Sequence, residues 1–110
     1  MTNRDKIESK VRKAVAGYLD KNASNTRVPF HVMLDEETKD HVVNTGASIM
    51  LNRLGVNTNP GGFVQAVLDN DLQGAFSRAD NINSQVLGFY TTMMYNLGID
   101  ITVQEIKEAS

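Results

Sequence analysis

The chain has 110 residues, 41% of them hydrophobic, and contains no cysteine. This size and composition fit one globular domain over residues 1–110, and the lack of thiols excludes disulfide and thiol chemistry. No apolar run approaches the ~20 residues of a membrane span. A net charge of −2 argues against a general nucleic-acid binder, which needs a basic surface. We therefore expect a cytoplasmic protein without a membrane or nucleic-acid partner.

The charges are distributed unevenly along the chain. Residues 1–27 carry seven basic and three acidic side chains, a net charge of +4, and residues 28–110 therefore carry −6. Such asymmetry is typical of a basic end that meets an anion, or of two surfaces that attract each other across a subunit contact. A solvated basic helix face is the simpler explanation.

The N-terminal quarter of the chain predicts one amphipathic helix over about residues 4–21. Its apolar side chains recur at spacings of three and four, which places them on one face: Ile7, Val11, Ala14, Val15, Tyr18 and Leu19. The basic residues fall mainly on the other faces. A polar loop follows up to Pro29, and residues 28–33 are the only modest strand candidate.

A second helical region begins after Asp35, which is well placed as an N-cap before two glutamates. The helix runs to about Thr45. Gly46 either ends it or only bends it, because an apolar face continues up to Gly55. Residues 55–62 then form the clearest loop in the sequence.

The longest periodic stretch lies in the second half of the chain. A helix of about two turns starts at Phe63 and ends near Asn70 and Asp71, both good N-caps for the next element. Apolar residues then advance by threes and fours over residues 72–97. One continuous helix of this length would measure about 40 Å, more than a compact monomer of this size requires. We therefore expect part of it to face another copy of the chain.

Two capping signals bear on how this half is divided. Asp80 offers an alternative in which it caps a fresh helix, but continuity is the favoured prediction. Thr102 and Glu105 form a capping box, which predicts a last helix over residues 103–109. The expected fold is thus all-α: a compact domain of four to five helices with one long helix in its C-terminal half, assembled as an oligomer.

Catalytic and metal-binding patterns are missing from the sequence. There are only two histidines, and Glu37 with His41 is more simply a surface hydrogen-bonded pair than half of a metal site. No serine sits in a nucleophile elbow, and the carboxylate spacings are unspecific. Methionines could form an adaptable binding surface, although core filling is the default explanation: Met33, Met50, Met93 and Met94. We expect no enzyme activity, no cofactor and no metal.

The strongest local binding signal is the loop that opens the Phe63 helix. Asn59, Gly61 and Gly62 surround its start, where glycines let a backbone approach a ligand and free amides attract phosphate or carboxylate. The loop lacks the lysine of a P-loop. A plain helix start with Pro60 at its first position is the alternative interpretation.

The second signal is a polar stripe beside the apolar face of the predicted long helix. Its members lie three or four apart: Asp71, Gly74, Arg78, Asn81 and Gln85. Arg78 is the only basic residue between Arg53 and Lys107. An internal pair with Asp71 or Asp80 is the simpler explanation, and pairing with an anionic ligand is the functional one.

A pattern in the C-terminal half resembles a family of small bacteriophage and prophage proteins. The matching residues are Pro60-Gly61-Gly62-Phe63, Ala66-Val67-Leu68, Asn70-Asp71-Leu72, Ala79-Asp80, Asn83 and Tyr95-Asn96. Residues 1–30 and the tail after Gly98 are unlike the family, and its tryptophan-containing C-terminus is absent here. The resemblance implies a phage context and hence the host cytoplasm, but no established activity.

From these signals we expect an accessory protein that sequesters a small anionic ligand without catalysis. The ligand class would be a nucleotide second messenger of immunity, such as a cyclic nucleotide or an ADP-ribose derivative. Asn59, Gly61 and Gly62 would contact phosphate, and Arg78 would pair with charge. The base or ribose would be bound by a set of polar residues that can also act as helix caps: Asn70, Asp71, Asp80 and Asn83. The alternative is an inhibitor or adaptor that binds a host protein.

Overall fold

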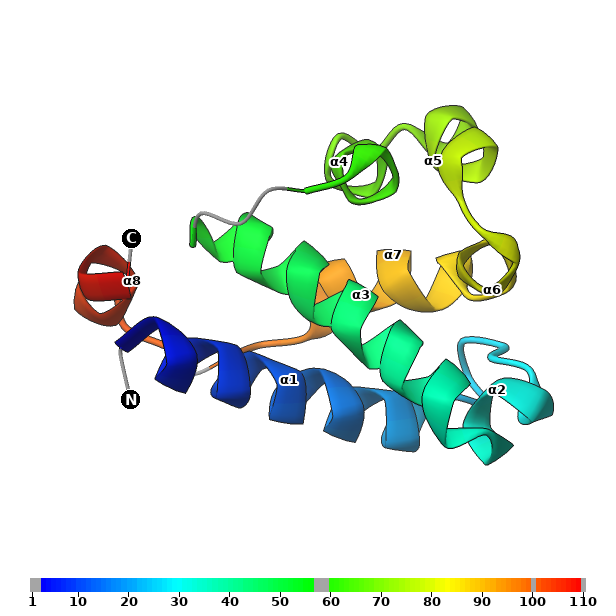
Figure 1. The fold of residues 1–110 in the computed structure, drawn as a ribbon, viewed down its shortest axis with the longest axis horizontal. Coiled ribbons are helices and arrows are strands. Elements are labelled where there is room, and N and C mark those ends of the chain that lie inside the picture. Colours follow the sequence, from blue (N-terminus) through cyan, green and yellow to red (C-terminus); the bar gives the residue numbers. More distant parts are fainter. Residues whose placement is uncertain (1–2, 57–59, 100, 110) are drawn as a thin grey trace.

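The computed structural model describes residues 3–56, 60–99 and 101–109. Within these ranges the chain forms eight helices and no strand, so the all-α prediction is confirmed. The helices are α1 (Asn3–Asn22), α2 (Phe30–Leu34), α3 (Glu36–Leu54), α4 (Gly62–Leu68), α5 (Leu72–Arg78), α6 (Asn81–Gln85), α7 (Leu87–Asn96) and α8 (Val103–Ala109). Figure 1 shows α3 crossing over α1, with α4 and α5 above it and α8 beside the start of α1.

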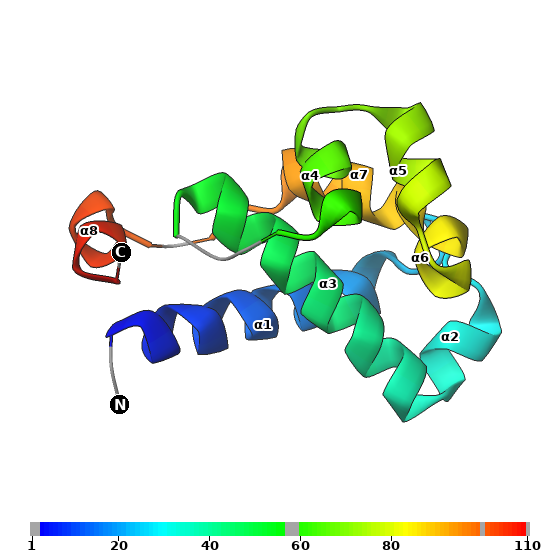
Figure 2. The same cartoon turned by 45° about the horizontal axis from the view of Figure 1, so that its top comes forward.

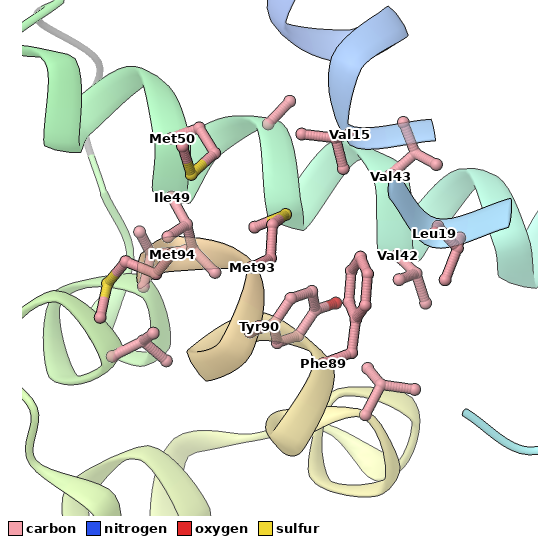
Figure 3. Close-up of a cluster of buried hydrophobic side chains, with 14 of the residues drawn as sticks. Val15, Leu19, Val42, Val43, Ile49, Met50, Phe89, Tyr90, Met93 and Met94 are labelled. Carbon is pink, nitrogen blue, oxygen red and sulfur yellow. The ribbon is translucent and has the colours of Figure 1, made fainter. Parts of the chain in front are cut away.

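The centre of the core is α7, which lies against both α1 and α3. Phe89, Tyr90 and Met93 are completely buried there (Figure 3). The ring of Tyr90 lies 5.8 Å from that of Phe63, and the ring of Phe89 lies 6.0 Å from that of Tyr18. These aromatic contacts connect α7 to α4 and α1. The methionines of this region fill the core, as the default explanation predicted: Met50, Met93 and Met94.

Gly46 does not end the second helix, because α3 continues through it to Leu54. It is buried where α1, α3 and α7 meet. A Cβ atom at this position would stand 2.8 Å from Cγ1 of Val15 and 3.5 Å from Cε of Met93. The glycine therefore allows close packing of the three helices. The helix ends instead at Gly55, whose φ of 89° is the left-handed conformation typical of a glycine C-cap.

The prediction of one long helix over residues 72–97 is wrong. The structure divides this stretch into α5, α6 and α7, with breaks at residues 79–80 and at Val86. A continuous helix would be about 40 Å long, whereas the longest dimension of the molecule is 37 Å. The breaks let α5, α6 and α7 run in different directions, as the two views of the ribbon show (Figures 1 and 2). The predicted count of four to five helices was too low partly for this reason.

The strand candidate over residues 28–33 is also wrong. Phe30–Leu34 forms the short helix α2, which follows Pro29 and precedes the N-cap Asp35. Val32 of this helix is fully buried and Met33 is partly buried against the core, so these two side chains anchor it. No neighbouring strand is present among the described residues, so an extended segment here would leave its backbone unpaired.

Two capping predictions are confirmed. The Asp35 side chain accepts a hydrogen bond from the Thr38 amide at 3.2 Å, at the start of α3. At the start of α8, the Glu105 amide donates to Thr102 Oγ1 at 3.1 Å, and the Thr102 amide donates to Glu105 Oε1 at 3.3 Å. This reciprocal pair is the predicted capping box.

Candidate functional site

The structure brings three of the predicted ligand-binding residues together around Gly74. Asp71 precedes α5 and its Oδ1 accepts a hydrogen bond from the Gly74 amide at 3.0 Å, which caps the helix. Arg78, at the other end of α5, turns back and donates from Nη1 to the Gly74 carbonyl oxygen at 3.4 Å. Gly62 of the neighbouring helix α4 completes the group. We call Gly62, Asp71, Gly74 and Arg78 the Arg78 cluster.

Two glycines make room for the arginine side chain. A Cβ atom on Gly62 would stand 2.7 Å from Cδ of Arg78, and one on Gly74 would stand 2.9 Å from Nη1. Both distances are shorter than van der Waals contact. The Arg78 side chain thus lies across the backbone of α4 and α5 at positions that hold no side chain.

The expected internal ion pair of Arg78 is not formed. Arg78 is exposed, and no carboxylate of the described residues lies within ion-pair distance of its guanidinium. Asp71 Oδ2 and Arg78 Nη1 both lie within 3.0 Å of the position that a Cβ atom on Gly74 would take. Asp71 uses Oδ1 for the helix cap. A guanidinium and a carboxylate oxygen therefore lie side by side without a direct ion pair.

Asp80 has a different role from the one predicted. Its Oδ1 accepts from the Asn83 amide at 2.7 Å and caps α6, and its Oδ2 lies 2.8 Å from Nε2 of His41. The predicted partner of His41 was Glu37, one turn earlier on the same helix. The actual partner comes from α6 and ties this helix to α3. Both carboxylate oxygens of Asp80 are thus engaged in holding the fold.

Asn83 is removed from the surface altogether. It is the one buried polar side chain among the described residues, and its Oδ1 accepts a 2.6 Å hydrogen bond from the Tyr90 hydroxyl. Burial raises the pKa of the Tyr90 hydroxyl well above its ordinary value, since the surrounding core disfavours the phenolate. Asn83 therefore belongs to the core and cannot contact a ligand at the Arg78 cluster.

The remaining candidates flank α4. Gly61 precedes α4 in an extended conformation and provides no side-chain cap, and Pro60 lies before the helix and not at its first position. Asn70 is exposed in the turn between α4 and α5, where its φ of 60° is left-handed. This conformation is one that asparagine tolerates better than most residues. Asn59 lies outside the described residues.

An exposed apolar surface on α2 was not predicted from the sequence. Phe30 is 85% exposed and Leu34 is 79% exposed, the highest values among the large apolar side chains described. A cavity of about 480 Å³ lies beside them between α2 and the end of α1. Its lining consists of Asp20, Lys21, Ala23, Ser24, Val28, Phe30 and Met33. The spacing of four between Phe30 and Leu34 places both on one face of the helix, but it does not by itself indicate that this face is exposed.

A second groove, of about 440 Å³, separates the outer sides of α1 and α3. Its charged lining is mixed: Arg12, Lys13, Lys39, Glu36 and Asp40. Lys39 already pairs with Asp20 at 2.6 Å, and Arg12 is hydrogen-bonded to Asn44. Lys13 also lines this groove and forms no ion pair among the described residues. What sets Arg78 apart is therefore its packing across Gly62 and Gly74.

Comparisons with family models, with curated proteins and with solved structures found no match. In the part of the chain that the structure describes, no three histidine, aspartate or glutamate side chains come together as a metal site requires. None of the described helices is long and apolar enough to cross a membrane.

Proposed function

We propose that this chain is a non-catalytic binding module that captures a small anionic ligand at the Arg78 cluster. The observation that supports this proposal is the state of Arg78: an exposed guanidinium without a carboxylate partner among the described residues, packed across two glycines. Arginine presents five donors in a planar fork that matches phosphate and carboxylate oxygens. Among the described residues only the Gly74 carbonyl oxygen accepts from it.

The helix that carries Arg78 gives up stability to place it there. Gly74 lies inside α5 and costs about 1 kcal/mol of helix propensity relative to alanine. An alanine Cβ at this position would collide with the capping carboxylate of Asp71 and approach Nη1 of Arg78. The glycine therefore serves the joint placement of these two side chains. An arginine that only increased solubility would need no such arrangement.

The Asp71 carboxylate beside Arg78 indicates a ligand that carries a hydrogen-bond donor as well as an anionic group. Asp71 Oδ2 has no hydrogen-bond partner in the described part of the chain, while Oδ1 caps α5. A donor fork beside a free acceptor suits a ligand with both an anionic group and a hydroxyl or amine. Nucleotides have this combination in their phosphate and ribose or base. In the phage context that the sequence pattern implies, the ligand would be a cyclic nucleotide or an ADP-ribose derivative acting as an immune signal.

Calorimetric titration of the protein with a panel of cyclic nucleotides and ADP-ribose derivatives tests the proposal. Arg78→Gln is expected to weaken any binding at least tenfold, because it removes the charged fork. Arg53→Gln is the matched control: it removes the same charge from an exposed arginine that lies 5.3 Å over the Tyr95 ring. Equal losses for the two variants, or no binding across the panel, would refute the proposal.

A further inference from the structure

The surface of α2 exposes two large apolar side chains and lies outside the Arg78 cluster. We define the α2 surface as Phe30 and Leu34 together with the adjoining cavity of about 480 Å³. The two side chains lie four positions apart on one helix and therefore point the same way. Burying such side chains is favourable, and large contiguous apolar patches on soluble proteins mark interaction sites. We infer that a second copy of this chain covers the α2 surface by antiparallel pairing of the two α2 helices.

The shape of the α2 surface suits pairing with a second copy. Phe30 projects beside the cavity that it helps to line, so a protruding group and a hollow stand next to each other on the same surface. A two-fold axis through such a surface places the protrusion of each copy opposite the hollow of the other. This is the self-complementarity that an isologous dimer contact requires. The hollow is partly apolar, since Ala23, Val28 and Met33 contribute to it.

The charged residues on either side of α2 favour antiparallel pairing. Lys21 and Arg27 precede α2, and Asp35, Glu36 and Glu37 follow it directly. All five of these residues are exposed. Figure 1 shows α2 between the loop that follows α1 and the start of α3. The basic residues therefore lie before α2 along the chain and the acidic residues after it. Antiparallel pairing brings the basic end of each copy beside the acidic end of the other, which parallel pairing does not.

The acidic end also argues against an anionic membrane as the occupant. Asp35, Glu36 and Glu37 stand next to Leu34 and would be repelled by acidic lipid headgroups. The size of the surface predicts a weak contact. A standard interface buries about 800 Å² per partner, and five residues of α2 with the cavity rim approach only part of that area. We expect a dimer that dissociates on dilution.

Sedimentation velocity over a range of protein concentrations tests the inference without any ligand. The wild type should shift from monomer to dimer, and the double variant Phe30→Ser with Leu34→Ser should remain monomeric. Leu72→Ser is the control, since Leu72 is 54% exposed on α5 and lies outside the α2 surface. A wild type that stays monomeric at all concentrations overturns the inference. So does a dimer that the double variant leaves intact.

A charge exchange tests the antiparallel arrangement. Lys21→Glu and Glu37→Lys should each raise the dimer dissociation constant several-fold, and the combined variant should restore it. Failure of the combined variant to recover, with both single variants impaired, overturns antiparallel pairing. A monomeric wild type that instead binds one other protein through Phe30 and Leu34 would mark the surface as a heteromeric site. The nucleotide titration of Arg78→Gln is independent of all these results.

Discussion

The hydroxyl of Tyr90 donates a 2.6 Å hydrogen bond to Oδ1 of Asn83 inside the core. Tyr90 belongs to α7 and Asn83 to α6, so the bond joins two helices that the break at Val86 separates. The Tyr90 hydroxyl and Asn83 Oδ1 thus provide each other's hydrogen-bond partner in the buried core. No buried side-chain nitrogen or oxygen of the described residues lacks a partner. The pair therefore allows one polar residue to be buried without an unsatisfied group.

Tyr90→Phe should destabilise the protein by about 1–3 kcal/mol, because the Asn83 oxygen would stay buried without a donor. The free energy of unfolding from urea denaturation measures this loss. Tyr95→Phe is the control, since Tyr95 is 61% exposed and removal of its hydroxyl should change stability little. Equal effects of the two substitutions would show that the buried bond does not stabilise the fold.

The same tyrosine should make the fold sensitive to alkali. Burial raises the pKa of Tyr90 in the folded state above the value of about 10 for an unfolded chain. Tyr90 therefore holds its hydroxyl proton more tightly in the folded state than in the unfolded chain. The contribution of protonated Tyr90 to the free energy of unfolding is complete below pH ~10 and decreases as the pH rises further. We expect the stability difference between the wild type and Tyr90→Phe to shrink between pH 9 and pH 11. A constant difference over that interval would contradict the buried assignment.

Asp80 should contribute more to stability than its partner His41. Asp80→Ala removes the cap of α6 and the contact with His41, and loss of a cap costs about 0.5–2 kcal/mol. His41→Ala removes only the exposed contact, worth at most about 1 kcal/mol. Denaturation of both variants and of the double variant gives the coupling between them. A larger loss for His41→Ala than for Asp80→Ala would contradict this order.

Two glycines inside long helices should respond in opposite ways to alanine. Gly17→Ala should stabilise the protein by up to about 1 kcal/mol, because nothing lies within 4 Å of the new Cβ. Gly46→Ala should destabilise it, because a β-branched, fully buried Val15 stands 2.8 Å from the new Cβ. Overpacking of this kind costs about 1–3 kcal/mol, more than the gain in helix propensity. Thermal denaturation distinguishes the two, and stabilisation by both would refute the close packing at Gly46.

Local signals in the sequence predicted those elements whose ends are fixed by nearby residues. The helix over residues 103–109 followed from Thr102 and Glu105, three positions apart, and the start of α3 followed from Asp35. The break between α5 and α6 was not predicted, although Asp80 offered the signal. The apolar residues keep a helical spacing across this break. The chain turns there because a continuous helix over residues 72–97 would be longer than the molecule.

The candidate site was predictable only in part for a similar reason. The joint position of Gly62 and Arg78 depends on how α4 packs against α5, yet both residues had been singled out from loop composition and charge. Asn83 was misplaced because its burial depends on a tyrosine seven positions later on another helix. The exposure of Phe30 and Leu34 was not predicted, because it depends on how α2 packs against α3.

The break at Asp80 has a consequence for motion. Helix α5 makes most of its contacts with α4, whereas α7 is embedded between α1 and α3. The segment that carries Arg78 can therefore open by local fraying while the centre of the protein stays folded. Amide hydrogens of α5 should exchange with solvent faster than those of α7, as hydrogen exchange followed by mass spectrometry can measure. A ligand held by Arg78 would then slow amide exchange in α5 alone, because binding of the ligand and ordering of α5 would be coupled.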